Sequence, residues 1–245
     1  MVSQQSSRRL LSQSSQVETK KKNETGEEKN RRPIFARSWS LSEYVSRKLF
    51  NAGVSANAIS ISSVVFSLGS FACFSAIPLL DSASHSFEPL LWLGGGVCVQ
   101  ARLLANMFDG MVATRSSEIH PLGGIYNEVP DRISDVLTLV GFSIACGQPL
   151  VGAFTGLLSV MTAYIRAVGA VYGANQCFQG PMAKPHRMFA VIACSALLAM
   201  APWLFPGVDT TMVSSSVLYM ICAGTLLTCI RRQMTIAKQL MHIAK

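Results

Sequence analysis

The chain has 245 residues, half of them hydrophobic and 14% charged, and its formal net charge at pH 7 is +8. Soluble globular domains are about 25% charged, so this composition argues against one. The charges concentrate in residues 1–48 and long uncharged stretches follow, which is typical of a membrane protein with a basic arm. Nucleic acid is not expected as a partner, because the arm mixes both signs of charge and has no interleaved aromatic residues. Membrane lipids with anionic head groups suit such an arm better.

Residues 1–36 are polar and of low complexity, and they are expected to form a disordered basic arm. The stretch that follows, "RSWSLSEYVSRKLFNAG", repeats its apolar residues at spacings near three and four. This periodicity predicts an amphipathic helix that lies in the membrane interface. Trp39 and Tyr44 would anchor this helix, with Arg47 and Lys48 directed toward the lipid head groups.

Long apolar segments make up most of the remaining chain, and a spanning helix needs about 20 residues. Six such segments are expected to cross the membrane, at 57–79, 89–112, 131–148, 150–172, 187–205 and 212–230. None shows the sustained alternation of a barrel strand. The predicted fold is therefore an all-α integral membrane protein with an interfacial helix and six transmembrane helices. It forms one domain over residues 37–230, followed by a basic cytoplasmic tail at 231–245.

The loops between these segments sort by charge. The loops near 80–88, 148–150 and 206–211 contain no Lys or Arg, whereas the arm, the other two loops and the tail contain them. Because basic loops stay in the cytoplasm, this alternation predicts a multi-pass protein with both termini cytoplasmic.

Two polar stripes are predicted at the cytoplasmic edge, one ending the second span and one opening the third. The first consists of Arg102, Asn106, Asp109, Gly110 and Ala113, which share one helical face. The second consists of Asn127, Asp131 and Asp135, with Glu128 adjacent. A short loop makes the two helices antiparallel neighbours, so two oxygen-rich faces meet in a site suited to Mg²⁺ or Mn²⁺. Gly110 and Ala113 would let a ligand approach the backbone closely.

The stretch 106–131 resembles the signature of the CDP-alcohol phosphatidyltransferase family, D-x2-D-G-x2-A-R-x8-G-x3-D-x3-D. Without a gap, the pattern falls on Asn106, Asp109, Gly110, Ala113, Thr114, Gly123, Asn127 and Asp131. Two further stretches, "GVSANAIS" at 53–60 and "GPMAKPHRM" at 180–188, are similar to the family's starts of its first and fifth spans. The resemblance covers residues 38 to 230.

The resemblance implies an enzyme that transfers a substituted phosphate from a CDP-alcohol to an acceptor alcohol and releases CMP, in phospholipid biosynthesis. The four acidic positions of the family bind divalent metal, which corresponds here to Asn106, Asp109, Asn127 and Asp131. The last of them, Asp131, would also act as the general base on the acceptor hydroxyl. A membrane-embedded site favours CDP-diacylglycerol as the donor, although a lipid acceptor with a CDP-linked head group stays open. The family also implies a homodimer.

Three signature positions depart from the family pattern. Asn replaces Asp at 106 and 127, and Thr114 replaces Arg. An amide oxygen can bind a metal but brings no charge, so weaker metal binding is expected, which leaves open whether one or two metals are held. Glu128 and Asp135 could compensate from behind the ligands, and Arg102 or Arg115 could supply the missing cation for phosphate.

Several of these residues also have simpler interpretations. Asn106 and Asn127 could hold helices together, and Asn127 could instead cap the third span, with Pro130 in its first turn. Glu128 and Arg132 could form only an i, i+4 ion pair. Lys184 and Arg187 serve either topology and lipid contact or the binding of an acceptor phosphate.

Two other functions remain open. A catalytically impaired relative would bind CDP-lipid or act as a scaffold without releasing CMP. An unrelated six-helix transporter is disfavoured, because the polar residues gather at the membrane edge and no pair of broken helices lies at the midplane.

Overall fold

The computed structural model describes residues 39–80, 85–115, 123–205, 207 and 209–243, so the expected basic arm lies outside the described residues. The chain divides into Met1–Ile34 and Phe35–Lys245, and the second unit contains every element described below. The described residues form α2 (Ser40–Asn51), α3 (Ala56–Ala76), α4 (Glu88–Ala113), α5 (Gly123–Ala145), α6 (Pro149–Val171), α7 (Lys184–Leu204) and α8 (Thr210–Ile243), with short 3-10 helices η2 (Ile77–Leu79) and η3 (His85–Phe87). This part of the chain is all-helical, as predicted.

Among the described residues, five helical segments are long and apolar enough to cross a membrane: α3 with η2, α4, α6, α7 and α8. The chain is therefore a multi-pass integral membrane protein. The predicted third span corresponds to α5, which is 23 residues long but does not meet this composition. Its first half carries four charged residues, namely Glu128, Asp131, Arg132 and Asp135.

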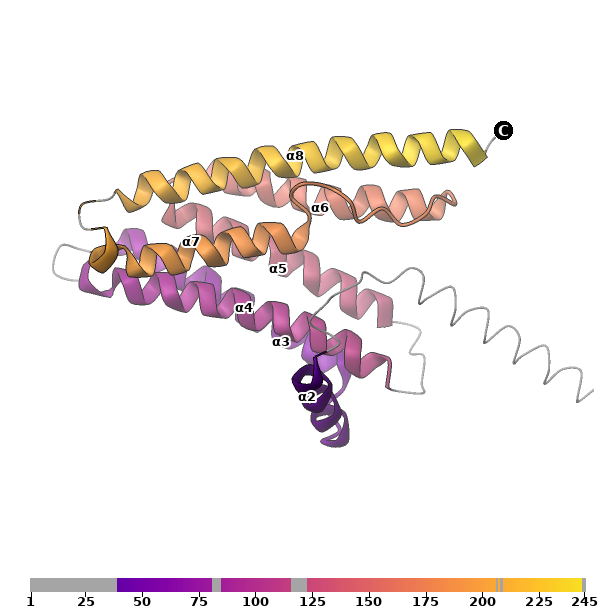
Figure 1. Ribbon diagram of the computed structural model, residues 1–245, viewed down its shortest axis with the longest axis horizontal. Helices are drawn as coiled ribbons and strands as arrows, with labels where there is room; N and C mark the ends of the chain where they lie inside the picture. The colour runs from indigo at the N-terminus through magenta and orange to yellow at the C-terminus, as the bar shows by residue number, and fades with distance from the viewer. Residues whose placement is uncertain (1–38, 81–84, 116–122, 206, 208, 244–245) are drawn as a thin grey trace, which may run out of the picture. The chain divides into compact units, whose positions relative to one another are not determined.

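The six long helices run alongside one another in an elongated bundle (Figure 1). α4 packs mainly on α3 and α7, α5 mainly on α3 and α6, and α8 mainly on α6. The expectation that α4 and α5 are direct neighbours holds at few positions, because α3 packs closely against both. A Cβ on Gly95 of α4 would lie 2.3 Å from the Phe74 ring, and one on Gly141 of α5 would lie 2.7 Å from Phe71 Cα. Small residues at these two positions allow the close packing.

An aromatic cluster fixes the end of the bundle away from the charged residues. Phe74, Trp92 and Phe142 come from α3, α4 and α5, and their ring centroids lie 5.7 to 6.0 Å apart. Tilted and edge-on rings at such separations stabilise one another beyond their burial. Because Trp92 is near the start of α4 and Phe142 near the end of α5, the opposite ends of these helices, which carry the polar stripes, are brought together.

Two helix boundaries differ from the sequence-based expectation. α5 begins at Gly123, so Asn127 lies inside the helix and Pro130 is an interior proline. The capping interpretation of Asn127 is therefore wrong. α8 continues past residue 230 to Ile243, because Ile236 and Leu240 pack into a small cluster with Ala174 and Cys177 of the α6–α7 loop.

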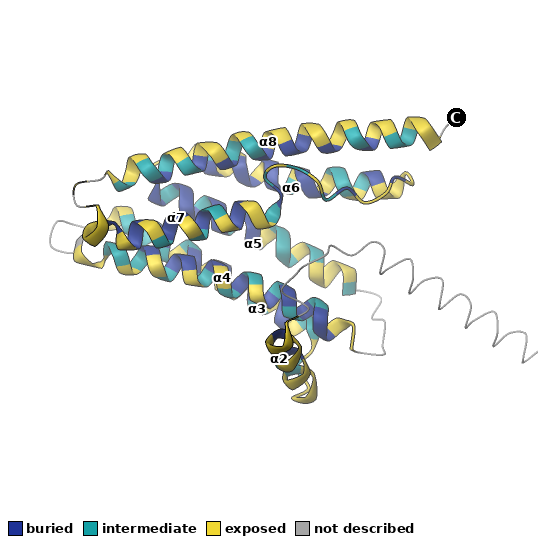
Figure 2. Cartoon of the chain, viewed as in Figure 1, coloured by how far each residue is buried: buried dark blue, intermediate teal, exposed yellow. Residues whose placement is uncertain are grey.

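The helix α2 turns two serines toward the rest of the protein. Ser42 and Ser46 are buried, whereas Trp39 and Tyr44 are 60% and 61% exposed. The exposed face of α2 is visible in Figure 2. An interfacial helix requires such an outward apolar face, which could then enter the lipid boundary.

Candidate active site

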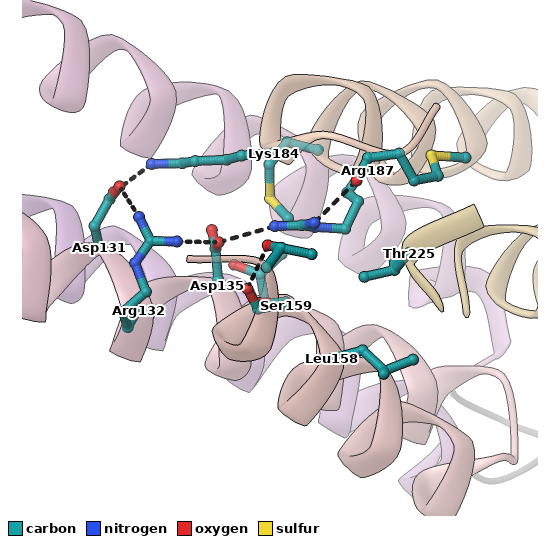
Figure 3. A network of polar contacts seen from close by, with 12 residues as sticks. Asp131, Arg132, Asp135, Leu158, Ser159, Lys184, Arg187 and Thr225 are labelled. Atoms are coloured by element: carbon teal, nitrogen blue, oxygen red, sulfur yellow. Dashed lines mark hydrogen bonds and ion pairs between the residues drawn. The ribbon is translucent and has the colours of Figure 1, made fainter. Parts of the chain in front are cut away.

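Asp131 of α5 is the point where three helices meet. Its Oδ1 accepts a hydrogen bond from Asn106 of α4 and forms an ion pair with Lys184 of α7. Its Oδ2 accepts a hydrogen bond of 3.1 Å from Arg132 (Figure 3). The Asp131 side chain is 14% exposed, so it can be reached from outside the bundle.

Asp109 lies on the same face of α4 as Asn106, one turn closer to the helix end. It is 3% exposed, and Ser60 of α3 donates a hydrogen bond of 2.7 Å to its Oδ2. Asp109 lies within electrostatic range of both Asp131 and Lys184. The two signature aspartates that the chain retains are thus near enough to interact electrostatically.

The ligand chemistry of this site fits a divalent cation, but with low charge. Two carboxylates, Asp109 and Asp131, and the side-chain oxygen of Asn106 are hard donors of the kind that Mg²⁺ and Mn²⁺ prefer. Asn127 is exposed on the first part of α5. Across the described residues, no group of three or more His, Cys, Asp and Glu side chains is gathered as metal ligands. Asn106 and Asn127 stand at two positions where the family pattern has carboxylates.

A buried ion network lies directly behind Asp131. Asp135 is fully buried and pairs with Arg102, which is also fully buried, and with Arg187 at 3.3 Å. Arg132 approaches the same carboxylate at 3.7 Å. A buried charge is tolerated only when it is paired and hydrogen-bonded, so this network locks α4, α5 and α7 together beneath the site.

Glu128 and Arg166 form the outer part of the same charged region. Glu128 pairs with Arg132 at 3.2 Å, which confirms the i, i+4 pair, and with Arg166 of α6 at 2.7 Å. Arg166 also donates to Gln176 and lies over the Phe178 ring at 5.1 Å. Arg166 is thus joined to the site through Glu128.

Not every predicted residue contacts the two central carboxylates. Among the described residues, the side chains that contact Asp131 or Asp135 are Arg102, Asn106, Arg132, Lys184 and Arg187. Arg115 is not one of them. Arg115 instead donates a hydrogen bond of 3.1 Å to the hydroxyl of Ser46 of α2. Gly110 and Ala113 lie on the Asp109 face at the end of α4, and Gly123 starts α5 with open space around its Cα.

Sequence reasoning missed three residues that shape the site. Ser60 holds Asp109, Arg132 touches both Asp131 and Asp135, and Arg232 of α8 donates to the carbonyls of Thr162, Phe178 and Gln179. The recurrence of serines at 60, 63, 67 and 70 on an apolar helix was a signal for the first. The role of Arg232 depends on how the α6–α7 loop folds, which no local pattern reveals.

Comparison with known proteins gives one local match and several shared folds. No protein-family model matches the chain. Archaetidylinositol phosphate synthase of Aeropyrum pernix is 32% identical over 95 residues, which is 39% of this chain and 49% of that protein. The chain thus spans about half the length of this curated relative.

The solved structures extend the likeness over most of the bundle. Phosphatidylinositol phosphate synthase of Mycobacterium tuberculosis in complex with manganese and citrate has a TM-score of 0.62 at 19% identity, over 80% of this chain and 88% of that one. The same enzyme with CDP-DAG bound has a TM-score of 0.61 at 19% identity, over 81% and 94%. At this level of identity the likeness establishes the fold.

Fold and site together define a helical membrane protein whose bundle has, at one end, a site that combines carboxylates with Lys and Arg side chains. The resemblance to the CDP-alcohol phosphatidyltransferase family, first drawn from residues 106–131, is supported by the match to one curated relative, and the solved structures share the fold.

Proposed function

We propose that this protein is a metal-dependent CDP-alcohol phosphatidyltransferase that uses CDP-diacylglycerol as donor and releases CMP. The observation that carries the proposal is the convergence on Asp131. A half-buried carboxylate meets an amide from α4 and an ammonium from α7, with a second carboxylate, Asp109, beside it. Both retained acids of the signature, although 22 positions apart in the sequence, belong to one site.

The proposed roles follow from the side chains present. Asn106, Asp109, Asn127 and Asp131 would hold Mg²⁺ or Mn²⁺, which supplies charge neutralisation for the pyrophosphate of the donor. Asp131 takes the proton of the acceptor hydroxyl, and the acceptor oxygen bonds to the phosphorus that carries the diacylglycerol. The bond from that phosphorus to CMP then breaks. Gly110, Ala113 and Gly123 leave room for the nucleotide beside the backbone.

We further propose that the acceptor is itself phosphorylated. The positively charged side chains of the site outnumber its four carboxylates. They are Arg102, Arg132, Arg166, Lys184 and Arg187. The buried Nε atoms of Arg102, Arg132 and Arg187 have no hydrogen-bond partner within the described residues. Lys184, Arg132 and Arg166 are the partly exposed members, so a phosphate could reach them first, with Arg187 behind. The names of the relatives, which are inositol phosphate synthases, support a phosphorylated polyol.

We also propose that the site and both termini face the cytoplasm and that the protein works as a homodimer with six spans. The orientation is supported by the distribution of Lys and Arg among the loops. α5 would cross as the sixth span because Asp131, Arg132 and Asp135 are mostly buried and are paired with charged partners within the bundle.

The test is CMP release by the purified protein in detergent, with CDP-diacylglycerol, Mg²⁺ or Mn²⁺ and pairs of alcohols with and without a phosphate. Release that depends on metal and on a phosphorylated alcohol is the expected result. Release with the unphosphorylated member of a pair alone would remove the phosphate part of the proposal. Binding of CDP-diacylglycerol without CMP release by any alcohol would instead favour the catalytically impaired, lipid-binding function.

A further inference from the structure

A row of buried serines lines the face of α3 that packs against α4 and α5. It consists of Ser60, Ser63, Ser67 and Ser70. Three of these hydroxyls donate back to carbonyls of α3 itself, at 2.7 to 2.8 Å. Two of the four reach another helix: the Ser70 hydroxyl lies 3.5 Å from that of Thr138 of α5, and the Ser60 hydroxyl donates to Oδ2 of Asp109 of α4 at 2.7 Å.

The surroundings of Asp109 make the hydrogen bond from the Ser60 hydroxyl important. Asp109 is 3% exposed, and a buried carboxylate needs strong hydrogen bonds to offset the loss of water. An O–H donor at this distance to an ionised oxygen forms a charge-assisted bond, which is about twice as strong as a neutral one.

The position of Ser60 relative to α4 is fixed by its neighbour in sequence. Ile59 packs in a small apolar cluster with Ala105 and Val112 of α4, which lie on either side of Asp109 along that helix. The start of α3 is fixed as well, because Ser55 caps it by accepting from the backbone N–H of Ala58 at 3.2 Å. The hydroxyl of Ser60 is therefore held in place before it meets the carboxylate.

We propose that Ser60 is a positioning residue for metal binding: by holding Oδ2 of Asp109, it fixes the plane of that carboxylate and presents its other oxygen to the cation. This inference rests on the proposed function, since it takes Asp109 as a metal ligand. Partners that orient a ligand from behind typically change metal affinity by about 10- to 100-fold when removed.

The experiment measures Mn²⁺ affinity of the purified full-length protein in detergent, from the electron paramagnetic resonance signal of free Mn²⁺. Ser60→Ala is expected to weaken binding by about 10- to 100-fold. Ser60→Thr keeps a hydroxyl and is expected to retain most of the affinity. Ser63→Ala is the matched control, because this buried serine lies on the same face of α3 but donates only within its own helix.

Two further variants keep the outcomes distinct. Asp109→Asn is expected to weaken Mn²⁺ binding at least as strongly as Ser60→Ala. Wild-type affinity in Asp109→Asn, or no Mn²⁺ binding by the wild type, would overturn the metal site of the proposed function and the role of Ser60 with it. Weakened binding in Asp109→Asn but wild-type affinity in Ser60→Ala would overturn the role of Ser60 alone. If Ser60→Ala does not fold, Ser60→Cys replaces it, because a thiol fills similar space but donates poorly. Equal affinity in Ser60→Cys and Ser60→Thr would then contradict the inference.

Discussion

The side-chain amide of Asn106 donates to the carboxylate of Asp131, and so joins α4 to α5 at a place where the family signature has two aspartates. Two carboxylates in such contact repel each other unless a cation lies between them. Asn106 removes that repulsion and keeps one oxygen for a metal. If Asn106 is a metal ligand as proposed, the substitution is expected to trade metal affinity for stability of the metal-free protein.

The variant Asn106→Asp tests this trade directly. It is expected to bind Mn²⁺ more tightly than the wild type, because a further charge joins the ligands. It is also expected to unfold at a lower temperature without metal, since the new carboxylate faces Asp131. Thermal unfolding with and without Mn²⁺ measures both effects. Weaker Mn²⁺ binding would remove Asn106 from the ligands.

Asp131→Asn is expected to abolish CMP release, because an amide cannot accept the proton of the acceptor hydroxyl. Glu128→Gln is the matched control on the same helix. Glu128 is 47% exposed and pairs only at the edge of the site, so much of the activity should remain. Equal loss in the two variants would mean that Asp131 is not the base.

Lys184→Met is expected to raise the KM for a phosphorylated acceptor by about tenfold or more, because a charge-assisted hydrogen bond contributes about 1.5–3 kcal/mol. The KM for CDP-diacylglycerol should change much less. Steady-state kinetics with each substrate varied in turn gives the comparison, and Lys238→Met, on an exposed part of α8, serves as control. A similar rise in both KM values would contradict binding of the acceptor phosphate by Lys184.

Asp135→Asn is expected to destabilise the protein by about 3–5 kcal/mol, because Arg102 and Arg187 lose the counter-charge of a fully buried ion network. Glu43→Gln breaks an exposed pair with Arg47 and should cost less than about 1 kcal/mol. Unfolding in detergent followed by circular dichroism measures both. A small effect at Asp135 would indicate that the network is not closed in the native protein.

Arg232→Met is expected to loosen the α6–α7 loop, which leads directly into Lys184. The guanidinium of Arg232 donates at 2.9 to 3.1 Å to carbonyls of Thr162, Phe178 and Gln179, and Thr228 holds the loop beside it. Limited proteolysis should cut the variant faster between residues 173 and 183 than the wild type. Arg231→Met, on the exposed side of the same helix, is the control, and equal cutting in the two variants would contradict this role.

Much of this arrangement was accessible from the sequence. The spacing predicted that Asp109 and Asp131 lie near each other, and apolar length located every long helix of the bundle. The start of α5 was missed because Pro130 was taken for a first-turn residue, although the helix begins at Gly123. The sequence also could not reveal which charged side chains pair with one another. Lys184 pairs with Asp131, and Arg102 pairs with Asp135, only because α4, α5 and α7 meet in three dimensions.

The central claim is tested most directly by measuring CMP release from CDP-diacylglycerol by the wild type and Asp131→Asn side by side, with Mn²⁺ and a phosphorylated inositol as acceptor. We expect release by the wild type that needs both metal and acceptor, and none by the variant. Undiminished release by Asp131→Asn, or no release by a wild type that still binds the CDP-lipid, would contradict a transferase built around this carboxylate.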